Sequence, residues 1–67
     1  MKDIGRILKE RRNHLGITQL DLSELAGISA NTLYKIERGQ ANPTMAVLFK
    51  LADVLGMEYK LEVKKIL

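Results

Sequence analysis

The sequence predicts a mainly α fold: a compact four-helix domain, followed by a C-terminal β-strand that pairs across a dimer. Four glycines (Gly16, Gly27, Gly39 and Gly56) each follow an apolar-periodic stretch, as helix-ending glycines do. After Gly56 the pattern changes to strict alternation, which favours a strand. The 67 residues suffice for one small helical domain, expected at residues 1–56, and a dimerisation strand at residues 57–67.

Hydroxyl residues mark the starts of three helices. Thr18, Ser29 and Thr44 each precede an apolar-periodic stretch, and each side chain can accept a hydrogen bond from a free amide in the first turn. Combined with the glycine stops, these caps predict helices near residues 3–15, 18–26, 29–38 and 44–55.

One apolar face of each helix is expected to form the core. The fourth helix also carries Val47, Phe49 and Val54, so we expect a second surface to cover it. The predicted core residues, in chain order, are Ile4, Ile7, Leu8, Leu15, Leu22, Leu25, Ala26, Leu33, Ile36, Met45, Leu48, Leu51, Ala52 and Leu55.

The third helix presents polar chemistry away from the core. With Leu33 and Ile36 directed inward, the outward set mixes amide, hydroxyl and cationic groups with a small apolar residue, which suits base edges and phosphates. An ordinary solvated face is the alternative. The outward residues are Ser29, Ala30, Asn31, Thr32, Tyr34, Lys35 and Arg38.

Composition limits the other classes of function. The chain has no cysteine and one histidine, His14, so a metal site is not expected, and no cofactor is expected either. No nucleophile–base–acid grouping or phosphate loop is present, which argues against an enzyme. The absence of a long apolar run predicts a cytoplasmic protein without a membrane partner. A net charge of +3 suits a polyanionic partner.

The central segment resembles a known family. Thr18-Gln19, Leu22, Gly27-Ile28-Ser29, Thr32-Leu33, Ile36 to Gly39 and Pro43 together resemble the Cro/phage-repressor, or xenobiotic-response-element, type of helix-turn-helix over residues 4–56. The resemblance implies a lambda-repressor-like fold and double-stranded DNA as partner. It also implies a nucleoid-associated, sequence-specific transcriptional regulator, expected to be a repressor that binds a palindromic operator as a homodimer.

The same resemblance implies roles for individual residues. Gln19 would contact a phosphate and brace the third helix, and Arg12 would form a partly buried ion pair with Glu37 in preference to a phosphate contact. Tyr34 either contacts DNA or stacks on a neighbouring side chain. Ala30, Asn31 and Lys35 occupy base-reading positions, Ser29 and Tyr34 neighbour them, and Thr32 and Arg38 lie near the DNA backbone.

The C-terminal alternation predicts a register as well as a strand. No other segment alternates, so we expect the strand to pair with a second copy of the chain. In an antiparallel pair centred on Leu61, Glu58 faces Lys64 and Lys60 faces Glu62 of the partner, so all facing charges are opposite. The apolar residues expected to form the dimer contact and cover the helical cores are Met57, Tyr59, Leu61 and Val63.

A helix-turn-helix followed by one strand also resembles the HipB-like antitoxins. This second resemblance implies an alternative function: an antitoxin or adaptor whose main partner is a protein, such as a HipA-like kinase toxin. DNA binding would then serve autorepression. The amide and cationic side chains of the third helix favour DNA over an apolar protein surface, although the two partners do not exclude each other.

Overall fold

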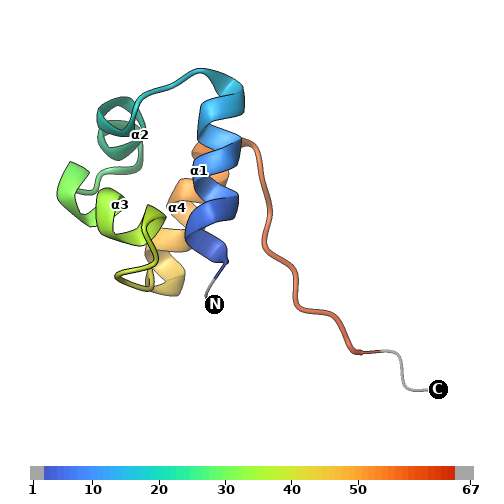
Figure 1. Ribbon diagram of the computed structural model, residues 1–67. Helices are drawn as coiled ribbons and strands as arrows, with labels where there is room; N and C mark the ends of the chain where they lie inside the picture. The colour runs from blue at the N-terminus through green and yellow to red at the C-terminus, as the bar shows by residue number, and fades with distance from the viewer. Residues whose placement is uncertain (1–2, 65–67) are drawn as a thin grey trace.

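Capping residues set the helix boundaries in the structure. The computed structural model describes residues 3–64, with four α-helices: α1 (Ile4–Leu15), α2 (Gln19–Ala26), α3 (Ala30–Glu37) and α4 (Met45–Leu55) (Figure 1). The hydroxyls of Thr18, Ser29 and Thr44 accept from amides three residues onward at 3.0, 3.0 and 3.2 Å. Every predicted helix is therefore present, with each end within one residue of its expected position.

The turn between α2 and α3 depends on Gly27. Its φ of 72° lies in the left-handed region, which residues with a β-carbon rarely adopt. Its amide and that of Ile28 close the end of α2 by donating to the Glu24 and Ser23 carbonyls. Gly27 therefore allows the chain to turn sharply after α2 and begin α3 at Ala30.

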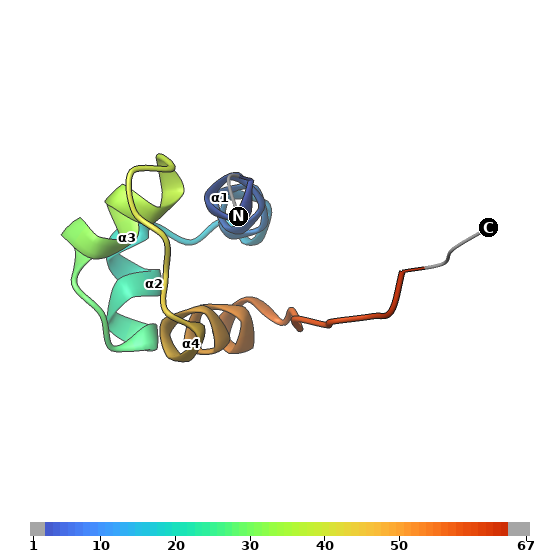
Figure 2. The same cartoon turned by 90° about the horizontal axis from the view of Figure 1, so that it is seen from below.

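The four helices surround one apolar core. α1 packs against α3 and α4, and α2 packs against the same two helices, so α3 and α4 are held from both sides (Figures 1 and 2). Burial of this shared interior is the main stabilising term for so small a domain. The buried apolar residues are Leu8, Leu22, Ala26, Leu33, Ile36, Leu48, Leu51, Ala52 and Leu55.

Four residues predicted for the core lie at the surface instead. Ile7, Leu15, Leu25 and Met45 are 42 to 66% exposed. Each helix spans only two or three turns, so its buried stripe is narrower than its apolar sequence pattern. Periodicity identified the apolar side of each helix but overestimated the width of the buried part.

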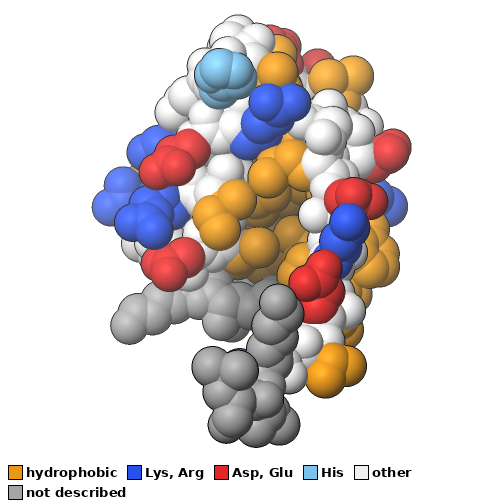
Figure 3. Space-filling view, turned by 90° about the vertical axis from the view of Figure 1, so that its right-hand side faces the viewer, with side chains coloured by type: hydrophobic (Ala, Val, Ile, Leu, Met, Phe, Trp, Pro, Cys, Tyr) orange, Lys and Arg blue, Asp and Glu red, His pale blue; other side chains and the backbone are white. Residues whose placement is uncertain are grey.

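The prediction that α4 needs a second surface to cover Val47, Phe49 and Val54 was also too broad. Val47 and Val54 pack against the core, and Phe49 is the residue of the three that remains exposed, at 51%. The single chain therefore covers most of the apolar side chains of α4. The face of the molecule next to the C-terminal segment is hollowed, and apolar side chains line the hollow (Figure 3).

Residues 57–64, here called the tail, leave the helices as an extended segment without strand structure (Figures 1 and 2). The Met57 amide still donates to the Ala52 carbonyl at 2.8 Å, and its side chain packs against the core. Leu61 and Val63 are 85 and 96% exposed in the single chain, and their contact across a dimer stays a prediction. The last positions of the predicted strand, 65–67, lie outside the described residues.

The helices that the structure describes are all too short or too polar to span a bilayer.

Candidate nucleic-acid interface

The start of α3 is held by two hydroxyl groups. Ser29 Oγ accepts from the Thr32 amide at 3.0 Å and donates to Thr32 Oγ1 at 2.8 Å. Because Thr32 Oγ1 acts as the acceptor in this pair, its own proton stays available for an acceptor outside the protein. The two residues lie next to each other at the exposed end of α3, and Ser29 orients Thr32.

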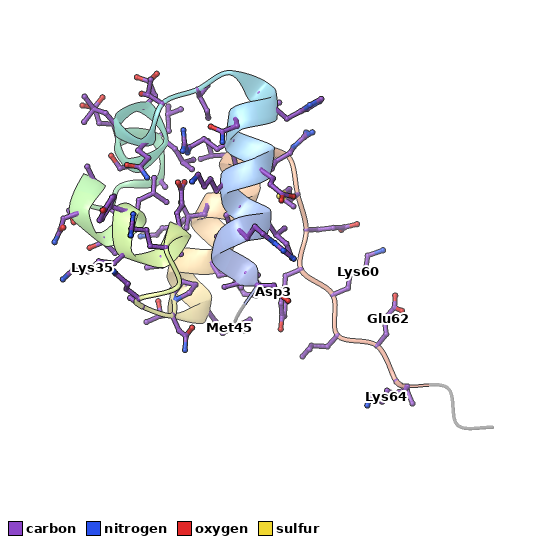
Figure 4. The ribbon with its side chains drawn as sticks, viewed as in Figure 1. Asp3, Lys35, Met45, Lys60, Glu62 and Lys64 are labelled. Atoms are coloured by element: carbon purple, nitrogen blue, oxygen red, sulfur yellow. The ribbon has the colours of Figure 1, made fainter. Side chains whose placement is uncertain are left out.

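The two faces of α3 differ in polarity and in exposure. Leu33 and Ile36 are buried in the core, at 0 and 1% exposure. Ala30, Asn31 and Lys35 lie on the exposed side, and Lys35 projects from α3 away from the rest of the molecule (Figure 4). The structure therefore brings the three residues expected to read bases onto one open face, as an amide, an ammonium group and a methyl group.

Tyr34 and Arg38 form a pair on the same surface. The Arg38 guanidinium lies 5.3 Å from the centre of the Tyr34 ring, within the range of a cation–π contact. Tyr34 thus stacks on a neighbouring side chain in this structure, one of the two alternatives considered for it. The contact holds the Arg38 charge at the C-terminal end of α3, the helix that also carries Lys35.

Behind this face, a buried network ties three helices together. Arg12 Nε donates to Glu37 Oε2 at 2.8 Å, and Arg12 Nη2 donates to Glu37 Oε1 at 2.9 Å. The same guanidinium reaches the Ile17 carbonyl through Nη1 at 2.9 Å. A two-pronged pair of this kind fixes both distance and orientation. Arg12 therefore links α1, the loop that precedes α2 and the end of α3.

Gln19 joins this network at the first residue of α2. Its Nε2 donates to Glu37 Oε1 at 2.9 Å, and the side chain is half-buried. A side-chain amide carries two N–H groups, so one remains after this bond. Glu37 thus holds the amide in place and accepts from both Gln19 and Arg12.

Burial of Glu37 changes the charge of the α3 face. Glu37 is the sole carboxylate in α3, and its side chain is 1% exposed beneath the Arg12 guanidinium. The remaining charges of α3 and its C-cap are Lys35 and Arg38, both exposed. The open face of α3 is consequently cationic, which favours a polyanion.

Gly5, for which the sequence pattern predicted no role, sets the close approach of α1 to α3. A Cβ placed on Gly5 would lie 1.9 Å from the Ile36 carbonyl oxygen, a severe overlap with backbone. Gly5 is buried inside α1, where glycine is otherwise unfavourable. A glycine within a helical pattern was the available signal, because such a residue often has a packing reason.

The tail residues expected at a dimer contact lie on another side of the molecule. Met57 is half-buried, and the Tyr59 ring lies 6.4 Å from that of Phe49. Lys60, Glu62 and Lys64 lie along the extended tail, on the side opposite Lys35 (Figure 4). The cationic face and the tail can therefore contact different partners at once. Within the described part of the chain, no group of His, Asp and Glu side chains could hold a metal ion.

The sequence matches a family model over most of its length. Residues 8–60 match the model HTH_3, described as helix-turn-helix, which covers α2, α3 and α4 and most of α1.

Relatives in archaea and bacteria carry consistent descriptions. A protein of Methanocaldococcus jannaschii, described as an HTH-type transcriptional regulatory protein, is 41% identical over 53 residues, which are 79% of this chain and 17% of that protein. An HTH-type transcriptional regulator of Methanothermobacter thermautotrophicus is 32% identical over 53 residues, 79% of this chain and 77% of that protein. One from Sinorhizobium fredii is 34% identical over 58 residues, 87% of this chain and 75% of that protein. The chain thus spans about a sixth of the first relative and three quarters of the other two.

Proposed function

Because the chain belongs to the helix-turn-helix family of the Cro/C1, or xenobiotic-response-element, type, we propose that it represses transcription by binding a palindromic operator as a homodimer. Membership makes it a DNA-binding transcriptional regulator and not an enzyme. Repression, the dimer and the operator are the additional elements of the proposal.

The exposed face of α3 is the observation that carries the proposal. Asn31 presents an amide that can bind adenine through two hydrogen bonds, and Lys35 presents an ammonium group that can donate to guanine. The Ala30 methyl suits contact with a thymine methyl group. In this assignment α3 enters the major groove with its first turn and middle against the base edges.

Residues at the edges of α3 bind the DNA backbone in this proposal. Gln19 uses its remaining N–H and Thr32 its hydroxyl proton to donate to phosphate oxygens. Arg38, supported by Tyr34, supplies a cation to a further phosphate. Ser29 acts mainly through Thr32, because its hydroxyl already accepts from and donates to that residue.

In this proposal the two chains of the dimer associate through their tails. Two tails pair antiparallel about Leu61, so that Glu58 faces Lys64 and Lys60 faces Glu62 across the axis. Pairing supplies the backbone partners that residues 58–64 lack within the described part of the chain. A two-fold dimer would place two copies of α3 about 34 to 36 Å apart, one turn of the duplex.

The exposed tail is also the feature that favours the antitoxin alternative. An extended segment with alternating apolar residues can add to a strand of another protein, such as a HipA-like kinase toxin. DNA binding by α3 would then serve autorepression. The cationic face of α3 has no role in that protein contact, which is why we place repression first.

Selection of binding sites from a pool of random DNA duplexes tests the proposal. We expect one enriched motif with two inverted halves whose centres lie about one helical turn apart. Titration of that duplex against a shuffled duplex then measures specificity at stated salt. Enrichment of a single unpaired half-site would contradict the dimer, and no enrichment would contradict sequence-specific binding.

A further inference from the structure

An apolar groove lies between α1, α4 and the start of the tail (Figure 3). Ile4, Ile7 and Leu8 of α1, Leu48 and Ala52 of α4, and residues 57–60 line it, and its volume is about 250 Å³. Sites for drug-sized ligands usually start near ~300 Å³ and include several convergent polar groups. This groove is smaller and mostly apolar, so it fits one or two aliphatic side chains better than such a ligand.

The tail of the same chain forms one wall of the groove but does not fill it. Met57 packs against the core, and the Tyr59 ring lies beside Phe49, with 6.4 Å between the ring centres. Beyond Tyr59 the chain runs away from the helices, leaving Leu61 and Val63 almost fully exposed. The described part of the chain therefore has an unfilled apolar groove and, further along the tail, two exposed apolar side chains.

We propose that this groove receives Val63 from a second copy of the chain, an inference that rests on the proposed homodimer. In the antiparallel register centred on Leu61, the partner's Val63 stands opposite Tyr59, the residue that forms the wall of the groove. Because directly opposite residues of an antiparallel pair project from the same face, the partner's Val63 lies on the same side of the pair as Tyr59, which lines the groove. Leu61 meets Leu61 of the partner subunit at the two-fold axis.

Charge complementarity selects a second copy over another occupant. Lys60 belongs to the tail segment that lines the groove, and this register sets its side chain opposite Glu62 of the partner subunit, on the side of the strand pair away from Val63. Glu58, also at the groove, meets the partner's Lys64. In a two-fold dimer the same contact fills both grooves, so neither chain keeps an unfilled groove. The groove thus contributes a docking surface in addition to the strand pair itself.

Cross-linking between two single-cysteine variants tests this placement, because the natural chain has no cysteine. Full-length Ile7→Cys and Val63→Cys chains are mixed, allowed to exchange and treated with a short bifunctional maleimide. We expect a covalent product containing one chain of each variant, identified by mass. The matched control replaces Ile7→Cys with Leu25→Cys, which is also exposed but lies outside the groove, and we expect loss of the mixed product.

A Leu61→Cys variant distinguishes the absence of the groove contact from the absence of the dimer. It should cross-link to itself if the tails pair about Leu61. Self-linking of Leu61→Cys without an Ile7–Val63 product would overturn the groove contact while leaving the strand pair intact. Loss of both products in a monomeric protein would overturn the dimer as well. A monomer-sized internal link in the double variant Ile7→Cys/Val63→Cys would show that the chain's own tail fills the groove, which also overturns the proposal.

Discussion

Helix α3 and the tail both expose most of their side chains, but they are exposed for different reasons. α3 is capped at Ser29, buries Leu33 and Ile36, and presents polar groups outward. The tail has no strand partner in the described chain and exposes Leu61 and Val63. Exposure to water costs the polar groups of α3 no free energy. Burial of the apolar groups of the tail, in contrast, would be favourable.

The stability of the folded chain and the stability of the proposed dimer therefore depend on different regions. The helical body and its α3 surface are complete in one chain, because the Arg12–Glu37 network and the core are both internal. In the proposed dimer, the tail gains its partners only through association. Substitutions behind α3 should therefore change the free energy of unfolding, and substitutions in the tail should change the dimer dissociation constant.

The largest effect is expected from Glu37→Leu. This change leaves the buried Arg12 guanidinium without its carboxylate partner, a loss of about 3 to 5 kcal/mol in the free energy of unfolding. Chemical denaturation measured by circular dichroism provides the test. Glu10→Leu is the matched control, because the Glu10–Arg6 pair is exposed and worth about 1 kcal/mol or less. Equal losses from the two variants would refute the structural role of the buried network.

Gly5→Ala is expected to have the next largest effect. The added methyl group would overlap the Ile36 carbonyl, so α1 must move away from α3 at a cost of up to about 3 kcal/mol. Alanine is the better helix former, so helix propensity alone predicts the opposite sign. Thermal unfolding compared with Lys9→Ala, an exposed change on the same helix, distinguishes the two. A stabilised Gly5→Ala protein would show that α1 does not approach α3 this closely.

Asn31→Ala tests the reading function of the α3 face without disturbing the body. We expect a loss of about 1 to 3 kcal/mol of discrimination at one base pair of the operator, with the unfolding midpoint unchanged. Arg38→Ala should weaken binding to all sequences alike and lower the salt dependence by about one ion. Quantitative binding to a set of single-substitution duplexes measures both. Uniform loss from Asn31→Ala on every duplex would remove it from the reading residues.

Leu61→Asp should have the smallest effect on the folded chain. Because Leu61 is 85% exposed, we expect the free energy of unfolding of the monomer to change by less than about 0.5 kcal/mol. The dimer should dissociate, as measured by analytical ultracentrifugation across a concentration series. A dimer that persists at micromolar concentration would show that the main contact lies outside the tail. That result would remove the contrast between the tail and α3.

Local patterns in the sequence were sufficient to predict the helices. Thr18, Ser29 and Thr44 each accept the expected amide, and a glycine follows the last turn of α1, α2 and α4. Capping depends on residues within one turn of each other, so it can be recognised without tertiary contacts. The inward direction of Leu33 and Ile36 was predictable for the same reason, and with it the outward residues of α3.

Burial at the edges of the core was less predictable. Leu25 and Ile7 match the apolar spacing of their helices, yet they are 66 and 43% exposed. Val47 and Val54 fall outside the predicted stripe but contact the core. Burial depends on where a neighbouring helix crosses, and the crossing point is set by side chains on both helices.

The sequence alone determined where each helix starts and ends, which side of α3 faces outward, and that the tail alternates, because these properties come from neighbouring residues. Only the tertiary structure decided that Gly5 meets the Ile36 carbonyl, that Gln19 and Arg12 share Glu37, and that a groove opens beside the tail. These features join residues on different helices. Their geometry depends on how closely the packed helices approach, a quantity to which every side chain in the core contributes.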